Sequence, residues 1–353
     1  MYKKLSIGMM TLLALLSSCS GVTPHISAIC EENKVGNCIV KWETAPLIEG
    51  EVKVYASTDP DHIPEKNAVA SANIADQWVT VINADPTQRR YYTLLFDERH
   101  RKQVASRNVN LPGIQNFRDL GGYPSGGSGK EVRWGKLYRS GEAERLNPFT
   151  LKKLKNMGVK TVIDLRSPSE KIGKPSLSKD FKVVDIPLIS GNTGEILKDI
   201  MYGRIKSDTV YRLVERMNRE LMLNSTDEFR RVFDVLLDED NYPVVIQCTS
   251  GKGRTGIVSA LILAALDVNE DLIMYDYRLS NHYFNIRRAW RDAYSLPPRR
   301  QEAVTTLFSA RENFLNAAKD EVESKYGSVE DYLKEGIGLD KSELKKLKRL
   351  LLH

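Results

Sequence analysis

The residues best suited to chemistry in this chain are Cys248 and Arg254, which five residues separate. A thiolate is a strong nucleophile, and an arginine can donate two parallel hydrogen bonds to phosphate oxygens. The intervening residues are Thr249-Ser250-Gly251-Lys252-Gly253. A loop of this kind, when it leads into a helix, turns its backbone N–H groups towards one point and binds an anion there. The segment therefore predicts nucleophilic attack on a phosphate, with the Thr255 hydroxyl donating to the sulfur as it leaves.

The segments on either side of this loop support that interpretation. Residues 244–246 (VVI) form a short apolar run typical of a buried parallel strand, and residues 257–266 (IVSALILAAL) predict a buried helix. Gly251 and Gly253 allow the tight backbone turns that an anion-binding loop requires. Two alternatives stay open: a buried structural cysteine beside a glycine-rich turn, and the cysteine loop of a sulfurtransferase, which is typically one residue shorter.

The elements that must position the loop read as an α/β fold from residue 111 onwards. Short strands are predicted at 161–165 and 182–186, and amphipathic helices at 150–158 and 227–237. Open α/β sheets bind their ligands at the carboxyl ends of the strands, where the loop after residues 244–246 would lie. Further amphipathic helices are expected over residues 301–353.

The spacing C-x5-R-[ST] is that of protein tyrosine phosphatases, and the resemblance extends along the chain. Residues 114–123 (IQNFRDLGGY) look like a motif of the bacterial tyrosine phosphatase family that includes secreted, lipid-active members. Four further segments resemble that family: 137–142 (LYRSGE), 162–170, 276–281 (DYRLSN) and 326–333 (YGSVEDYL). The resemblance covers residues 111–353. It implies an α/β tyrosine phosphatase-like catalytic domain with a parallel-centred sheet flanked by helices. In this family helices cover the site as a lid, here the 269–300 stretch.

The chain departs from this family at two positions of the loop. Gln247 stands where the family usually has a histidine that orients the loop and tunes the thiol. Gly253 stands where the family often has an aspartate that could donate a proton. The remaining pattern, C-x-x-G-K-G-R-T-G, is similar to the loop of 3-phosphoinositide phosphatases, in which the lysine contacts additional phosphates. Lys252 is accordingly interpreted either as a contact for a second phosphate or as a solvated lysine.

A leaving alkoxide or phenolate needs a proton, and a positioned acid accelerates this step by about 10²–10⁴-fold. The sequence contains no Trp-Pro-Asp acid loop. The first candidate for the acid is Asp164, at the end of a strand expected beside the cysteine strand, with a structural pairing to Arg166 or Arg139 as the alternative. The second is Asp119, whose alternative role is in a turn, whereas His282 is interpreted as a histidine on a helix face.

The N-terminus predicts an export signal over residues 1–18. Lys3 and Lys4 precede an apolar run of 12 residues, Leu5–Leu16, which is too short to span a bilayer but suits a signal peptide. The run ends in Leu16-Ser17-Ser18-Cys19, which looks like the lipobox of bacterial lipoproteins. That resemblance implies lipidation of Cys19, a tether over 19–27, and a lipid-anchored protein of the bacterial cell envelope, periplasmic or outer-membrane. An ordinary secretory signal is the alternative.

Residues 28–110 predict a small all-β sandwich. Alternating apolar and polar residues mark strands at 38–42, 51–57, 77–81 and 91–96, separated by turn clusters that include the charged stretch 97–102. The pattern loosely resembles a fibronectin type III domain and carries no catalytic motif, so a spacer or docking module is expected. Cys30 and Cys38 flank a turn and would pair as a disulfide in an oxidising compartment. Two free, buried thiols are the alternative.

Composition limits the remaining possibilities. The chain has 353 residues, 41% hydrophobic and 28% charged, which excludes a disordered or collagen-like polymer, and its four cysteines exclude a disulfide-dense scaffold. The net charge is +6, and residues 111–353 hold 40 basic and 34 acidic side chains, which suits anionic substrates. We expect a cysteine-dependent phosphatase acting on phosphotyrosine or dual-specificity protein substrates, without metal, cofactor or nucleic acid. The alternatives are a phosphoinositide or inositol polyphosphate phosphatase and a non-catalytic phosphate-binding protein.

Overall fold

The computed structural model describes residues 23–33, 35–127, 129–144, 146–174, 177, 179–189 and 191–353. The predicted signal peptide and Cys19 lie outside these residues. The first strand begins at His25, so it already occupies the end of the stretch expected as a tether. Within the described residues, no helix is long and apolar enough to cross a membrane.

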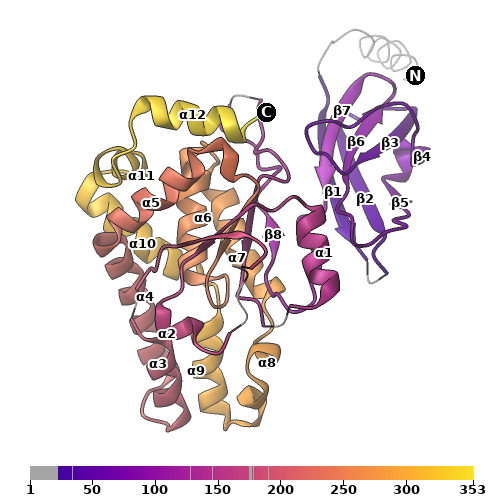
Figure 1. Cartoon of the computed structure of the whole chain (residues 1–353). Helices are drawn as coiled ribbons and strands as arrows, with labels where there is room; N and C mark the ends of the chain where they lie inside the picture. Colours follow the sequence, from indigo (N-terminus) through magenta and orange to yellow (C-terminus); the bar gives the residue numbers. More distant parts are fainter. Residues whose placement is uncertain are drawn as a thin grey trace, which may run out of the picture.

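The N-terminal part, residues 23–110, consists of two antiparallel sheets, which we call the N-terminal sheets (Figure 1). One sheet has the order β1-β2-β5 and the other β4-β3-β6-β7. The strands are β1 His25–Glu32, β2 Cys38–Ala45, β3 Glu51–Ser57, β4 Ala70–Asn73, β5 Trp78–Val81, β6 Tyr91–Phe96 and β7 His100–Ala105. Inward-facing residues of both sheets share one apolar core, in which Trp42 packs edge-on against Phe96 and donates its indole N–H to the Ile74 carbonyl oxygen at 2.8 Å.

The structure corrects the turn predicted at residues 97–102, and it contains as free thiols the two cysteines that were predicted to pair. Residues 97–102 were expected as a turn, but β7 begins at His100, so the turn is confined to the three residues before it. The charges of His100–Lys102 are compatible with a strand because β7 is an edge strand in which Arg101 is exposed and His100 and Lys102 are only half-buried. Cys30 and Cys38 are both buried free thiols in the structure, and the disulfide stays a prediction.

The C-terminal part is built on a five-stranded sheet of order β11-β10-β12-β9-β8. The strands are β8 Arg118–Asp119, β9 Leu137–Ser140, β10 Thr161–Asp164, β11 Lys182–Asp185 and β12 Val244–Gln247. The pairs β11–β10, β10–β12 and β12–β9 are parallel, and only β8 is antiparallel to its neighbour. The parallel-centred sheet agrees with the fold class expected from the sequence.

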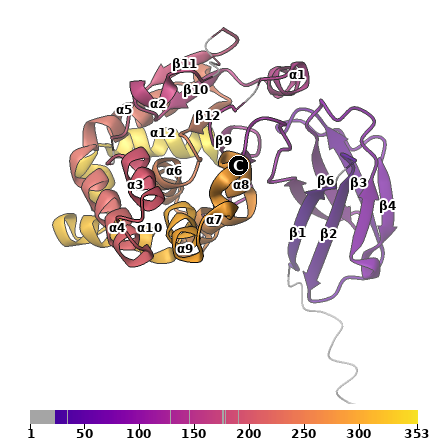
Figure 2. The ribbon, with the colours of Figure 1, turned by 90° about the horizontal axis from the view of Figure 1, so that it is seen from below.

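Helices cover both faces of this sheet, as the burial of every residue in β9, β10 and β12 requires. Val244 and Ile246 face the larger core, beneath α5 Thr226–Leu236, α6 Gly253–Ala265 and α10 Glu312–Tyr326. Val245 faces a smaller core with α1 Pro148–Asn156, on the side nearer the N-terminal sheets (Figure 2). The remaining helices of this larger face are α7 Glu270–Tyr283, α11 Val329–Asp331 and α12 Lys341–Leu351.

A separate group of helices extends beyond one end of the sheet, at the bottom of Figure 1. It contains α3 Thr193–Met201, α8 Ile286–Ala289, α9 Pro298–Phe308 and part of α4 Ser207–Asn224. These helices share their own apolar core, which includes Ile200, Val210 and Val304. The remaining short helix, α2 Pro168–Lys171, begins with a capping box in which Ser167 and Glu170 bond reciprocally to each other's backbone N–H.

Candidate active site

Cys248 lies where the sequence predicts it, in the loop between β12 and α6 at the carboxyl edge of the parallel strands. Its side chain is almost fully buried. We call residues 248–254 the phosphate loop. The described residues hold no cluster of three or more His, Cys, Asp or Glu side chains that could bind a metal ion.

The backbone of the phosphate loop is held from outside by its carbonyl groups. In a trans peptide the carbonyl and the following N–H point in opposite directions, so carbonyls bonded outwards leave the amides directed inwards. In the part of the chain that the structure describes, the amides of residues 249–252 donate to no backbone carbonyl of a turn or loop. The outward bonds are Glu142 N to Thr249 O (3.1 Å), Asn116 Nδ2 to Ser250 O (3.1 Å) and Gly251 O (2.9 Å), and Arg139 Nη2 to Gly251 O (2.9 Å).

Gly251 is required by the close approach of this loop to the end of β9. Its φ is +66°, and a Cβ at this position would lie 2.3 Å from the carbonyl carbon of Ser140 and 2.4 Å from the amide nitrogen of Gly141. Both clashes are with backbone, which has no rotamer by which to give way. Gly253 meets nothing within 4 Å, so the structure requires glycine at the first of these two positions only.

Arg254 is held by Glu170, a residue of α2 that we did not single out from the sequence. Nη1 of Arg254 donates to Oε2 of Glu170 at 2.7 Å and Nη2 to Oε1 at 2.6 Å, while the Thr249 hydroxyl donates to Oε1 at 2.7 Å. Burial opposes the charge of Glu170, but the hydrogen bonds and charge of Arg254 outweigh burial and hold the pKa of this carboxyl at about 2. The pair fixes the guanidinium beside the loop.

A buried ion cluster lies behind the phosphate loop and was also not assigned a role from the sequence. Asp276 of α7 accepts from Nε of Arg118 at 3.0 Å and from Nη1 of Arg139. Arg118 also donates to the Asn116 side-chain oxygen, and Asn116 in turn holds two loop carbonyls. Burial opposes ionisation of Asp276, but the two arginines lower its pKa below the usual range. The family-like segments at 114–123 and 276–281 thus meet behind the loop.

Lys252 points away from the phosphate site. Its ammonium donates to the carbonyl oxygens of Leu307 (2.7 Å) and Ser309 (3.1 Å), at the C-terminal end of α9. Burial lowers the pKa of Lys252 to about 7, against the opposing charge of Cys248. This orientation contradicts the expected contact with a second phosphate and also the alternative of a solvated lysine. It places the end of α9, just beyond the expected lid of 269–300, at the loop.

The depressed pKa of Lys252 predicts a pH-dependent stability. Between about pH 7 and the ordinary lysine pKa of about 10.4, the unfolded chain binds a proton that the folded chain does not, so stability rises with pH across this window. Lys252→Met should remove this rise. The unfolding free energy of wild type minus that of Lys252→Met should therefore increase by up to about 1.4 kcal/mol per pH unit. Urea unfolding at pH 7.0, 8.5 and 10.0 measures it. The exposed Lys346→Met is the control, and equal slopes for both variants would contradict the prediction.

The two candidate acids have their carboxylates engaged. Asp164 lies beside Gln247 in the sheet, as expected, but it accepts from Nε (3.0 Å) and Nη2 (2.8 Å) of Arg166. Asp119 is fully buried away from the loop, where it accepts from Arg89 and from the amides of Gly121 and Gly135. These contacts favour the structural alternatives over the role of proton donor for both residues.

Two further polar side chains at the loop are buried. The Thr255 hydroxyl, on the first turn of α6, has no hydrogen-bond partner among the described residues. Donation from this hydroxyl to the Cys248 sulfur stays a prediction. Gln247, where the family usually has histidine, is buried at the end of β12.

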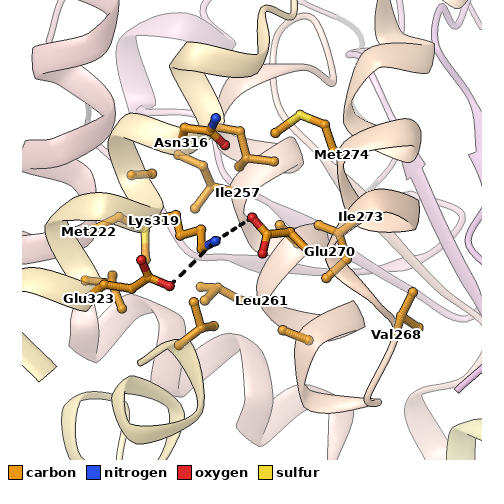
Figure 3. A pocket seen from close by; sticks show the side chains of 16 residues that line it. Met222, Ile257, Leu261, Val268, Glu270, Ile273, Met274, Asn316, Lys319 and Glu323 are labelled. Atoms are coloured by element: carbon orange, nitrogen blue, oxygen red, sulfur yellow. Dashed lines mark hydrogen bonds and ion pairs between the residues drawn. The ribbon is translucent and has the colours of Figure 1, made fainter. Parts of the chain in front are cut away.

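An apolar cavity of about 280 Å³ lies between α6, α7 and α10 (Figure 3). Ile257, Leu261 and Met274 contribute to its walls. Lys319 crosses it with ion pairs to Glu270 and Glu323, shown as dashed lines in Figure 3. None of the phosphate-loop residues lines this cavity, so it is distinct from the candidate active site.

Comparison with known proteins identifies the family. Residues 109–353 match the family described as "Tyrosine phosphatase family", and the chain belongs to this family. It is a phosphatase, a hydrolase of phosphate monoesters, as its relatives' names and the loop agree.

Two curated relatives are similar to about two thirds of this chain. A protein of Cupriavidus necator named as a tyrosine-protein phosphatase is 30% identical over 239 residues, covering 66% of this chain and 85% of that protein. The triple specificity protein phosphatase PtpB of Mycobacterium tuberculosis is 26% identical over 279 residues, covering 69% and 98%. Among solved structures, the core catalytic domain of the PP-IP phosphatase SIW14 from S. cerevisiae matches 62% of this chain and 96% of its own, with 16% identity and a TM-score of 0.29.

Proposed function

We propose that the chain hydrolyses phosphorylated protein side chains through a cysteinyl-phosphate on Cys248. The observation that carries this proposal is the anchored phosphate loop, whose carbonyls are bonded outwards and whose amides are left to bind an anion beside the buried thiol. Arg254 adds a guanidinium that Glu170 holds in place.

The chemistry takes place in two balanced steps. The Cys248 thiolate forms an S–P bond as the ester P–O bond breaks, and the leaving oxygen keeps the electron pair of that bond and takes a proton from solvent water. Water then forms a new P–O bond as the S–P bond breaks, releasing inorganic phosphate and the thiolate, which the Thr255 hydroxyl stabilises by donating to the sulfur. The loop amides and Arg254 stabilise the equatorial oxygens in both steps.

Lys252 bears on the choice of substrate. A phosphatase for inositol phosphates or phosphoinositides is the main alternative from the sequence. It rests on the loop pattern C-x-x-G-K-G-R-T-G and, within it, on Lys252 as a contact for a second phosphate. The ammonium of Lys252 is instead bonded to Leu307 and Ser309. With that support removed, phosphotyrosine and dual-specificity protein substrates are favoured.

Acid quench of the full chain with a phosphotyrosine peptide tests the proposal. We expect phosphate attached to Cys248, found by mass spectrometry of the peptide that contains it, and faster turnover of the peptide than of phosphoinositide or inositol phosphate. Absence of a phosphocysteine with turnover intact would refute the mechanism. Binding of phosphate without turnover would identify a non-catalytic protein, and turnover of thiosulfate and cyanide would identify a sulfurtransferase.

A further inference from the structure

The short ladder between β8 and β9 has two faces with different partners. Arg118 pairs with Arg139, and the next pair is Asp119 with Tyr138. Because neighbouring residues of a strand point to opposite faces, the arginine pair and the Asp119–Tyr138 pair lie on opposite sides. The four side chains are among the most deeply buried in the chain.

One face of this ladder contacts the N-terminal sheets. Arg89 donates from Nη2 to Oδ2 of Asp119 at 2.8 Å, and the hydroxyls of Tyr91 and Tyr138 are 3.0 Å apart. The Arg89 side chain is 6% exposed and that of Asp119 is fully buried, so these contacts are shielded from solvent. A solvent-shielded charge pair is far more sensitive to loss of one partner than an exposed pair.

Close packing accompanies these polar contacts. The Arg89 guanidinium lies 5.1 Å from the ring centre of Tyr91 and 5.4 Å from that of Tyr138. A Cβ added to Gly135 would lie 2.5 Å from the Tyr91 hydroxyl, so the N-terminal sheets leave no room for a side chain there. A simple spacer does not require an interface of this kind.

The other face of the ladder holds the phosphate loop. Arg139 donates to the Gly251 carbonyl, and Arg118 holds Asn116, which donates to the Ser250 and Gly251 carbonyls. Asp119 and Tyr138, which contact Arg89 and Tyr91, are therefore the chain neighbours of the two arginines that support the loop.

We propose that the N-terminal sheets hold the catalytic site in its active geometry, with Arg89 and Tyr91 as positioning residues. They fix β8 and β9, and these strands fix the outward bonds of the loop carbonyls, on which the inward direction of the amides depends. The inference rests on the proposed function of the Cys248–Arg254 loop. It gives the N-terminal sheets a role beyond the spacer or docking module expected from the sequence.

The test replaces Arg89 by methionine in the full chain. We expect kcat/KM for p-nitrophenyl phosphate to fall about 10-fold, within the range of couplings transmitted through packed side chains. The inhibition constant of inorganic phosphate should rise by a similar factor, because the displaced amides bind the anion less well. Arg89→Lys, which keeps the charge, should recover part of both. The control is Arg101→Ala, which removes an exposed ion pair with Glu65 in the same sheets and should change neither value.

A second variant covers the case in which Arg89→Met does not fold. Tyr91→Phe removes only the hydroxyl bonded to Tyr138, and we expect a 2- to 3-fold rise in the phosphate inhibition constant together with faster hydrogen exchange of the amides of 249–252. All assays are made well below the unfolding midpoint. Wild-type phosphate affinity in a folded Arg89→Met, or in Tyr91→Phe if the first does not fold, would overturn the inference.

The two levels of proposal fail in different ways. If the wild-type protein gives no phosphocysteine, the proposed function falls. If it gives a phosphocysteine at Cys248 while Arg89→Met and Tyr91→Phe keep wild-type kinetics and phosphate affinity, only the role of the N-terminal sheets falls.

Discussion

Cys248→Ser is expected to lower kcat towards p-nitrophenyl phosphate by about 10⁴-fold or more, the scale seen when a catalytic nucleophile is removed. The serine hydroxyl is nearly isosteric with the thiol, but its pKa lies far above that of a thiol, so no anion is available at neutral pH. Phosphate binding should survive, because the loop amides and Arg254 are unchanged. Steady-state kinetics and calorimetric titration with inorganic phosphate measure the two effects separately.

A matched control separates loss of the nucleophile from loss of a buried cysteine. Cys38 is also a buried free thiol, but it lies in the N-terminal sheets, and Cys38→Ala should keep kcat near the wild-type value. Full activity in Cys248→Ser would exclude this residue as nucleophile. Loss of wild-type activity in a chelator would point to a metal-dependent enzyme instead.

The parts of this site that the sequence predicts are those encoded within a few residues. The run 244–246 and the apolar stretch 257–266 predict a strand and a helix, and the structure has β12 at 244–247 and α6 at 253–265. The place of the phosphate loop is then predicted by the strand and the helix on either side of it. Hydrophobic periodicity and glycine spacing are local properties, so one sequence is enough to reveal them.

The supporting side chains could not be found in this way, because their partners are distant along the chain. Glu170 is 84 residues from Arg254, Arg139 is 112 from Gly251, and Asn116 is 135 from Gly251. Only a resemblance to a family pointed to their segments, and it gave them no role. The direction of the Lys252 side chain was equally hidden, since it depends on carbonyl groups at the end of α9.

The strands that were missed have a related explanation. Alternation predicted β2, β3, β5 and β6, whereas β7 carries His100, Arg101 and Lys102 at its start. Charged residues are common on exposed faces and edges of sheets, where they lower the apparent strand signal. The same limit applies to Asp119, whose burial against Arg89 is decided by the packing of two distant parts of the chain.

Arg254→Lys is expected to lower kcat/KM for p-nitrophenyl phosphate by about 10²–10³-fold, the loss typical when one preorganised donor to a transition-state oxyanion is removed. Lysine keeps the positive charge but cannot donate two parallel hydrogen bonds. It must therefore give up either Glu170 or the phosphate oxygens, whereas the arginine fork can serve both. The prediction fails if kcat/KM in Arg254→Lys stays within a few-fold of wild type.

Glu170→Gln tests how much of the contribution of Arg254 depends on its being held in position by Glu170. The amide keeps one acceptor oxygen but loses the second carboxylate oxygen and the negative charge, so we expect a smaller loss of kcat/KM than in Arg254→Lys.

With its folded pKa of about 2 against an ordinary value near 4.3, Glu170 contributes stability that is fully present above about pH 5 and is lost as pH falls towards 2. The kinetic effect of Glu170→Gln should accordingly be constant between pH 5 and 8, whereas a residue that donates the proton to the leaving group would change the shape of the pH–rate profile. A flattened profile in this variant would make Glu170 part of the proton transfer, and an unchanged profile would leave it as the support that orients Arg254.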